Sequence, residues 1–242
     1  MSANQFSVSP IGHIKTPFKQ KFAIPRQPNL AKAKGTIYLR EDLNDPDMFK
    51  GLEGFTHLWL LFVFHQTKDK GWKPAVKAPR LGGNQTMGVF ASRSTHRPNA
   101  IGMSVVKNLS WQQDDSGLLL NVEGVDLLDD TPIVDIKPYV PYADRVADAE
   151  DNLASYGAIP QREVLLESHV KELLNIARKK HPDIKQLLID VLAQDPRPAY
   201  RHKHENDDKT YRVALYDYDI GFKVENGSIK VMDFGPDKRS SV

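Results

Sequence analysis

The chain has 242 residues, a formal net charge of +2 at neutral pH and no cysteine. Because the charge is nearly balanced, the whole molecule is not a polycation, and any nucleic-acid contact must use a local basic patch. The lack of cysteine excludes disulfides, thiolate zinc sites and cysteine nucleophiles, and no run approaches the roughly 20 apolar residues of a membrane span. We therefore expect a cytoplasmic protein with neither membrane nor metal partners.

Up to about residue 145, short β-branched or aromatic runs are separated by turn-forming Gly, Pro, Asn and Asp. Strands at this spacing are typical of an all-β sandwich or barrel. The run 57–64, HLWLLFVF, is apolar on both faces of a pleated strand, which predicts a central strand. Further strands are expected at 36–39, 87–92, 101–106, 118–128 and 131–140.

The second part of the chain has another composition. Segment 141–157 is charged and is interpreted as a connector. Apolar residues at three-to-four spacing predict helices over 161–180 and 183–193. Segment 195–209 has two prolines and is expected to be irregular, and an alternating run with Asn226-Gly227 behind it predicts a closing hairpin. The fold class is thus α+β: a mainly antiparallel β-barrel domain over 7–147, then a small α+β domain over 148–242.

The sequence has no Walker A loop, no G-x-G-x-x-G after a strand, no G-x-S-x-G and no H-E-x-x-H. Four polar clusters instead interrupt or end the apolar runs, at 24–30, 65–66, 91–104 and 124–132. Singly, each also fits a rigid turn or a solvated rim. Together, polar groups at strand ends match a small-molecule site at a barrel mouth, where arginines suit a carboxylate or phosphate.

Six blocks of this sequence carry a resemblance to a known family. They are IGHIKTPFKQKFAIPRQPNL (11–30), LEGFTHLWLLFVFH (52–65), PRLGGN (79–84), GVFASRSTHRPNAIGMS (88–104), GVDLLDDTPIVDIKPYVPYAD (124–144) and DPRPAYR (195–201). With them the chain resembles the TsaA-like family, also called TrmO or YaeB, of β-barrel tRNA methyltransferases. Ser92 and Thr95 stand where members often carry Thr and Pro. The DPRPAY segment is typical of the bacterial two-domain form.

The resemblance implies an S-adenosylmethionine-dependent enzyme that methylates N6 of N6-threonylcarbamoyladenosine beside the anticodon of threonine tRNA. It also implies a homodimer whose site lies near the subunit interface. The cofactor contacts implied by the family are Arg26, Gln27, Pro28, His65, Gln66, Arg93, Met103, Asp126, Leu127, Leu128 and Asp129.

The target nitrogen is a weak nucleophile that must lose a hydrogen, so a positioned base would help the transfer. Asp195 and Tyr200 are candidates for that base, and Arg197 for holding the threonyl carboxylate or a phosphate. Alternatively, this segment is a rigid loop that only caps the second domain.

Two basic runs are candidates for RNA contact. The first holds Lys68, Lys70, Lys73, Lys77 and Arg80 with Trp72, and the second holds Arg197, Arg201, His202 and Lys203. The first run fits a solvated loop equally well. Two other classes stay open: a non-catalytic RNA-binding barrel, and a hydrolase or metal-dependent enzyme, against which the poor metal-ligand spacing argues.

Overall fold

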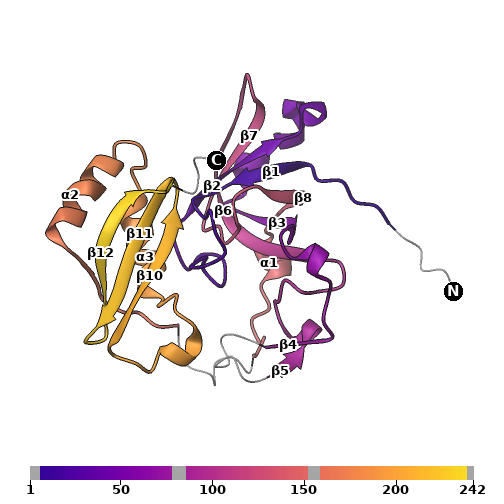
Figure 1. Ribbon diagram of the computed structural model, residues 1–242. Helices are drawn as coiled ribbons and strands as arrows, with labels where there is room; N and C mark the ends of the chain where they lie inside the picture. Colours follow the sequence, from indigo (N-terminus) through magenta and orange to yellow (C-terminus); the bar gives the residue numbers. More distant parts are fainter. Residues whose placement is uncertain (1–5, 78–85, 152–158, 239–242) are drawn as a thin grey trace.

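The computed structural model of the chain describes residues 6–77, 86–151 and 159–238, and its first part is a closed barrel (Figure 1). The six strands run in the order β1-β2-β7-β6-β3-β8, and every neighbouring pair is antiparallel, including β8 with β1. Their bounds are β1 Gly12–Lys15, β2 Lys34–Leu39, β3 His57–Val63, β6 Ile101–Asp114, β7 Gly117–Glu123 and β8 Thr131–Pro138. The predicted antiparallel barrel is confirmed.

The interior of the barrel is filled by every second side chain of its strands. In β3, Leu58, Leu60 and Phe62 are buried, while the residues between them are half-exposed. The predicted central strand is confirmed, because β3 lies between β6 and β8 in the barrel. Its outer face is partly covered, since the Trp59 ring lies against Tyr139 and its Nε1 donates to Asp144 at 3.1 Å. Its outward apolar side chains lie on the surface of the barrel.

Two other segments differ from the sequence-based expectation. Residues 87–92 were expected to form one strand, but a short hairpin of β4 (Ala75–Lys77) and β5 (Thr86–Gly88) is followed by a 3-10 turn at Val89–Ala91. β6 continues eight residues past the expected 106 and pairs with β7 as a long hairpin. This extension is polar, so its strand character comes from pairing and not from an alternating apolar pattern.

The second part of the chain is a four-stranded sheet with helices, in the strand order β10-β11-β12-β9. The bounds are α1 Pro141–Asp144, which precedes it, then β9 Val164–Leu166, α2 Ser168–Ala177, α3 Ile184–Ala193, β10 Asp207–Leu215, β11 Tyr218–Glu225 and β12 Ser228–Pro236. The helix expected over 161–180 is wrong at its start, because 164–166 pair in parallel with β12. No helix among the described ranges is both long and apolar enough to cross a membrane.

The closing hairpin has the predicted turn. Asn226 and Gly227 both have positive φ angles, 49° and 77°, as a type I′ turn requires. They connect β11 to β12, whose register pairs Glu225 with Ser228. The α+β fold class is confirmed by this sheet and the helices beside it.

The barrel and the second part share one hydrophobic core. Phe18, which is 1% exposed, forms an isolated antiparallel bridge with Leu215. The amide of Tyr216 donates to the carbonyl of Pro17 at 2.8 Å. Gln194, which caps the C-terminal end of α3, donates to the carbonyl of Leu30 at 2.9 Å. The segment after β1 is therefore packed between the barrel and the C-terminal sheet.

A buried ion-pair network holds the loop before β10. Arg197 and Asp195 are both fully buried and joined by two hydrogen bonds of 2.8 Å. Arg162 donates to Asp195 at 2.7 Å, and Arg197 lies 3.3 Å from Asp207. Removing one partner of a buried pair leaves a charge without compensation, which is far more costly than breaking an exposed pair.

We predict that Arg197→Met lowers the free energy of unfolding by about 3 to 5 kcal/mol, because Asp195 and Asp207 lose a buried counter-charge. Arg212→Met is the matched control, since Arg212 also pairs with two carboxylates, Asp219 and Asp233, but is 44% exposed. The control should lose only about 0 to 1 kcal/mol. Urea unfolding measures both, and equal losses would contradict the prediction.

Candidate active site

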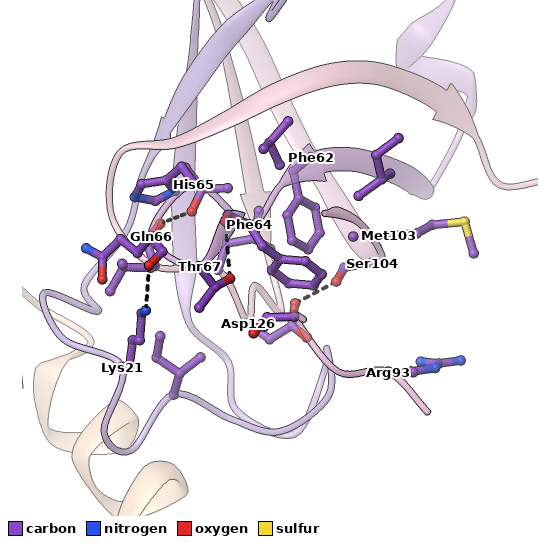
Figure 2. A pocket seen from close by; sticks show the side chains of 18 of the residues that line it. Lys21, Phe62, Phe64, His65, Gln66, Thr67, Arg93, Met103, Ser104 and Asp126 are labelled. Carbon is purple, nitrogen blue, oxygen red and sulfur yellow. Dashed lines mark hydrogen bonds between the residues drawn. The ribbon is translucent and has the colours of Figure 1, made fainter. Parts of the chain in front are cut away.

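A cavity of about 490 Å³ opens at one end of the barrel. It lies where β3 ends and β6 and β8 begin, and the segments that follow β1 and β7 complete its wall. Figure 2 shows His65, Gln66 and Lys21 on one side of it and Met103 and Arg93 on the other. A cavity of this size, with apolar walls and a few polar groups, suits a small-molecule ligand.

The structure brings most of the predicted cofactor residues together in this cavity. Nine of the eleven line it: Arg26, Gln27, His65, Gln66, Arg93, Met103, Asp126, Leu127 and Leu128. They come from four separate stretches of the chain, which only the closed barrel places side by side. Pro28 and Asp129 are not among the lining residues.

Asp129 instead forms hydrogen bonds within the protein. Its carboxylate accepts a hydrogen bond of 2.8 Å from the amide of Thr16 and one of 2.6 Å from Lys19. Its own amide donates to the carbonyl of Phe18 at 2.9 Å. The Thr16 hydroxyl also donates to the carbonyl of Leu127 at 2.9 Å. Asp129 therefore fastens the segment after β7 to the segment after β1.

The floor of the cavity depends on a glycine. Gly102 faces the rings of Phe62 and Phe64, and a Cβ atom at this position would collide with both. These two rings pack edge to face, with centroids 5.3 Å apart. A glycine at the start of β6 thus leaves room for Phe62 of β3 and Phe64, just after it, to pack at the floor of the cavity.

Asp126 is the one carboxylate among the residues that line the cavity. Ser104, which is 2% exposed, donates its hydroxyl to Oδ1 of Asp126 at 2.7 Å. Burial raises the pKa of Asp126 to about 6, although the Ser104 hydrogen bond and the charge of Arg93 act in the opposite direction. A carboxylate with such a pKa is largely ionised at neutral pH and can still accept a proton.

The cations of the cavity wall are held mainly by neutral oxygens. Arg93 donates to the side-chain oxygen of Gln27, and Arg97 donates to the carbonyls of Ser92 and Ser94 at 3.0 and 3.3 Å. Lys21 donates to the carbonyl of Gln66 at 3.3 Å. Because these partners carry no net charge, the wall keeps a positive potential toward an anionic ligand.

His65 lies at the Lys21 end of the cavity (Figure 2). Burial is the largest cause that lowers its pKa; the Val63 backbone acts against it, and the charges of Lys21 and Lys68 lower the pKa further against that of Asp130. The neutral imidazole is therefore favoured.

The predicted catalytic residues Asp195, Arg197 and Tyr200 do not line this cavity. Asp195 and Arg197 are enclosed in the buried network described above. Burial would raise the pKa of Asp195, but the hydrogen bond from Arg197 and the neighbouring positive charges outweigh it and hold the pKa below its usual range. Tyr200 is 60% exposed and lies in a 3-10 turn, with the Arg201 guanidinium 5.7 Å from its ring centroid.

Two cavity residues were not singled out by the sequence. Ser104 is one, because a serine inside an apolar strand also fits an outward position. Lys21 is the other, since it stands among further basic and polar residues. Arg97 lies in the predicted polar cluster 91–104 and does line the cavity. One sequence feature of β6 does indicate the cavity: its inward residues Gly102 and Ser104 are both small and leave room for a small molecule. Within the described ranges, no three His, Asp or Glu side chains are grouped to hold a metal ion.

Comparisons with known proteins identify the class of enzyme to which this fold and site belong. The chain is 44% identical over 215 residues to the putative S-adenosylmethionine-dependent methyltransferase RcsF of Pseudomonas aeruginosa, covering 88% of this chain and 90% of that protein. A crystal structure of TrmO from P. aeruginosa superposes with a TM-score of 0.80 at 38% identity, over 97% of this chain and 99% of that one. The closed barrel with its cavity is thus that of a β-barrel, S-adenosylmethionine-dependent methyltransferase.

The family follows from matches along nearly the whole chain. The model of the tRNA-methyltransferase O N-terminal domain matches residues 13–145, and that of the TrmO C-terminal domain matches 160–237. The tRNA (adenine(37)-N6)-methyltransferase of Escherichia coli is 44% identical over 234 residues, which cover 96% of this chain and 99% of that enzyme. The chain belongs to the TrmO family of tRNA methyltransferases. The predicted family and the enzymatic interpretation, as opposed to a non-catalytic barrel, are confirmed.

Proposed function

We propose that this enzyme transfers a methyl group from S-adenosylmethionine to N6 of N6-threonylcarbamoyladenosine, next to the anticodon of threonine tRNA. The observation that carries the proposal is the convergence of nine predicted cofactor residues on one cavity. It is supported by the E. coli relative, a tRNA (adenine(37)-N6)-methyltransferase that matches almost end to end. Because the substrate is a tRNA, we place the enzyme in the cytoplasm.

The cavity fits the methyl donor in size and in chemistry. Phe62, Phe64 and Leu128 offer apolar surface for the adenine ring, and Arg93 offers a guanidinium for the methionine carboxylate. Asp126 is the one acid among these lining groups. When bound, the donor supplies an activated methyl group on a sulfonium. The protein contributes by holding the acceptor nitrogen in line with that methyl group and by excluding water from the floor.

We predict that the purified enzyme with S-adenosylmethionine adds one methyl group to threonylcarbamoyladenosine in threonine tRNA. Mass spectrometry of the digested nucleosides measures this gain. The matched control is the same tRNA without the threonylcarbamoyl group, which should gain nothing if that group is part of the recognised substrate. An unchanged nucleoside mass with the modified tRNA would refute the proposed reaction.

The RNA is expected to approach across the basic rim of the cavity. Lys68 and Lys70 are exposed in the 3-10 turn Lys68–Lys70, which follows the cavity residues Gln66 and Thr67. Burial and the charge of Lys70 both lower the pKa of Lys21, so several cations face one another at this rim. Trp72, 58% exposed, offers a ring for stacking on a base. Lys73 and Lys77 continue the predicted run, whereas Arg80 lies outside the described residues.

The loop before β10 has a more restricted role in this proposal. Arg197 is enclosed, so we infer that Asp195 and Arg197 act as positioning residues that fix the loop carrying Tyr200 and Arg201. Tyr200 is the member of the predicted catalytic set that can meet RNA in this arrangement, by stacking on an unpaired base.

We predict that the double variant Lys68→Gln/Lys70→Gln binds tRNA more weakly and lowers the salt dependence of binding by about 1 to 2 in log–log slope. Its affinity for S-adenosylhomocysteine should be unchanged. The control is Arg40→Gln/Lys137→Gln, two exposed cations that already pair with Asp42 and Asp135. Fluorescence anisotropy at several salt concentrations measures both, and equal slopes in all three proteins would exclude this rim as the RNA path.

We further propose that two copies of the chain assemble through the outer face of β6. Ile101 and Met103 lie on that face and are 42% and 54% exposed, and Leu109, 40% exposed, follows on the same strand at its register shift against β7. The first two also line the cavity, so a partner there would border the site. Sedimentation should show a dimer for the native chain and a shift toward monomer for Leu109→Asp, because a charge would be buried. A monomeric native chain would refute this assembly.

A further inference from the structure

Methylation of a nitrogen that carries one hydrogen requires an acceptor for the released proton, and the cavity limits which groups can be that acceptor. Among its lining residues, Asp126 is the single carboxylate and His65 the single imidazole. The remaining ionisable side chains there are Lys21, Arg26, Arg93 and Arg97, which are cations at neutral pH. Asp195 is ion-paired on both sides in a buried network outside the cavity.

The position of Asp126 is central in the cavity. Figure 2 shows it beneath the ring of Phe64, between the His65 and Gln66 side and the Arg93 side. Ser104 from β6 donates to Oδ1, which fixes the orientation of the carboxylate toward the cavity. Because the methyl donor occupies the same cavity in the proposed reaction, this carboxylate faces the donor and the nitrogen that receives the methyl group.

We propose that Asp126 is the proton acceptor of the methyl transfer, an inference that rests on the proposed function. The N6–carbon bond forms as the carbon–sulfur bond breaks, the electron pair of that bond stays on sulfur, and the N6 proton passes to the Asp126 carboxylate. The products are the N6-methylated nucleoside, the thioether and a neutral carboxylic acid. Release of the products exposes Asp126 to solvent, to which it returns the proton.

Electrostatics favour Asp126 over His65 in this role. A proton on Asp126 converts a buried anion into a neutral acid, which burial against Phe64 and Leu127 favours. A proton on His65 would create a cation beside Lys21 and Lys68, which burial and both charges oppose. The two groups are therefore shifted in opposite directions, a pattern that separates an acceptor from a neutral ligand-binding side chain.

The groups that face Asp126 set the pH range in which it can act. Ser104 and the Asp126 amide donate to its carboxylate, and Arg93 is the nearest charge that acts on it. With its pKa at about 6, Asp126 loses its proton as the pH rises through that value. The rate constant kcat/KM should therefore fall as the pH drops below about 6. Removing the Ser104 hydroxyl withdraws stabilisation of the anion, so this fall should move to higher pH.

The first test is Asp126→Asn, which keeps an acceptor for the Ser104 hydroxyl but cannot take a proton. We expect kcat to fall by about 100-fold or more, while the affinity for S-adenosylhomocysteine, measured by calorimetry, stays within a few-fold. Asp130→Asn is the matched control, because Asp130 lies on the same segment but is exposed, pairs with Lys15 and does not line the cavity. It should keep native kcat.

The second test is Ser104→Ala, read by carboxyl carbon NMR of Asp126 in the ligand-free enzyme and by the pH dependence of kcat/KM. Both midpoints should move to higher pH together. The inference is overturned if Asp126→Asn retains native kcat, so that only the KM for the methyl donor changes, or if neither midpoint moves in Ser104→Ala. Failure of this inference can be told apart from failure of the proposed function. If the native enzyme methylates the tRNA, the proposed function holds whatever the role of Asp126.

Discussion

The hydrogen bonds around Thr16 are the constraint on which the rest of this structure depends. The Thr16 amide and hydroxyl bind the Asp129 carboxylate and the Leu127 carbonyl, so the cavity wall after β7 is fastened to the segment after β1. Two residues later, Phe18 is bridged to Leu215 of the C-terminal sheet. One short stretch of chain therefore holds both the cavity wall after β7 and the C-terminal sheet in place. A shift of that sheet cannot leave the cavity unchanged, because both are held by the same backbone.

The charges of the site are arranged by depth. Asp126 is enclosed by apolar groups at the floor, whereas Lys21, Lys68 and Lys70 lie at the exposed rim. Exposed cations attract a polyanion over a distance of about a Debye length. An enclosed acid acts only on a molecule that has entered the cavity. In the proposed function, tRNA binding thus falls to the exposed rim and the chemistry to the enclosed floor of one cavity.

The sequence predicts the parts of this architecture that local pattern determines. Short β-branched and aromatic runs between turn residues locate most of the barrel strands, and Asn226-Gly227 locates the closing turn. Partners distant in sequence decide the rest. Residues 164–166 have a helical apolar spacing but pair with β12, and Asp129, three residues after Asp126, binds Thr16 instead of facing the cavity. The enclosure of Arg197 also depends on Asp207 and Arg162, which no local pattern connects to it.

The glycine at the start of β6 has a consequence for the size of the cavity. At position 102 any side chain would occupy the space of the Phe62 and Phe64 rings, so a larger residue and an open cavity exclude each other unless both rings are also replaced. A larger residue at this position would therefore change the cavity wall itself and not only the strand that carries it. The space open to a small molecule in this barrel is thus set by the absence of one side chain.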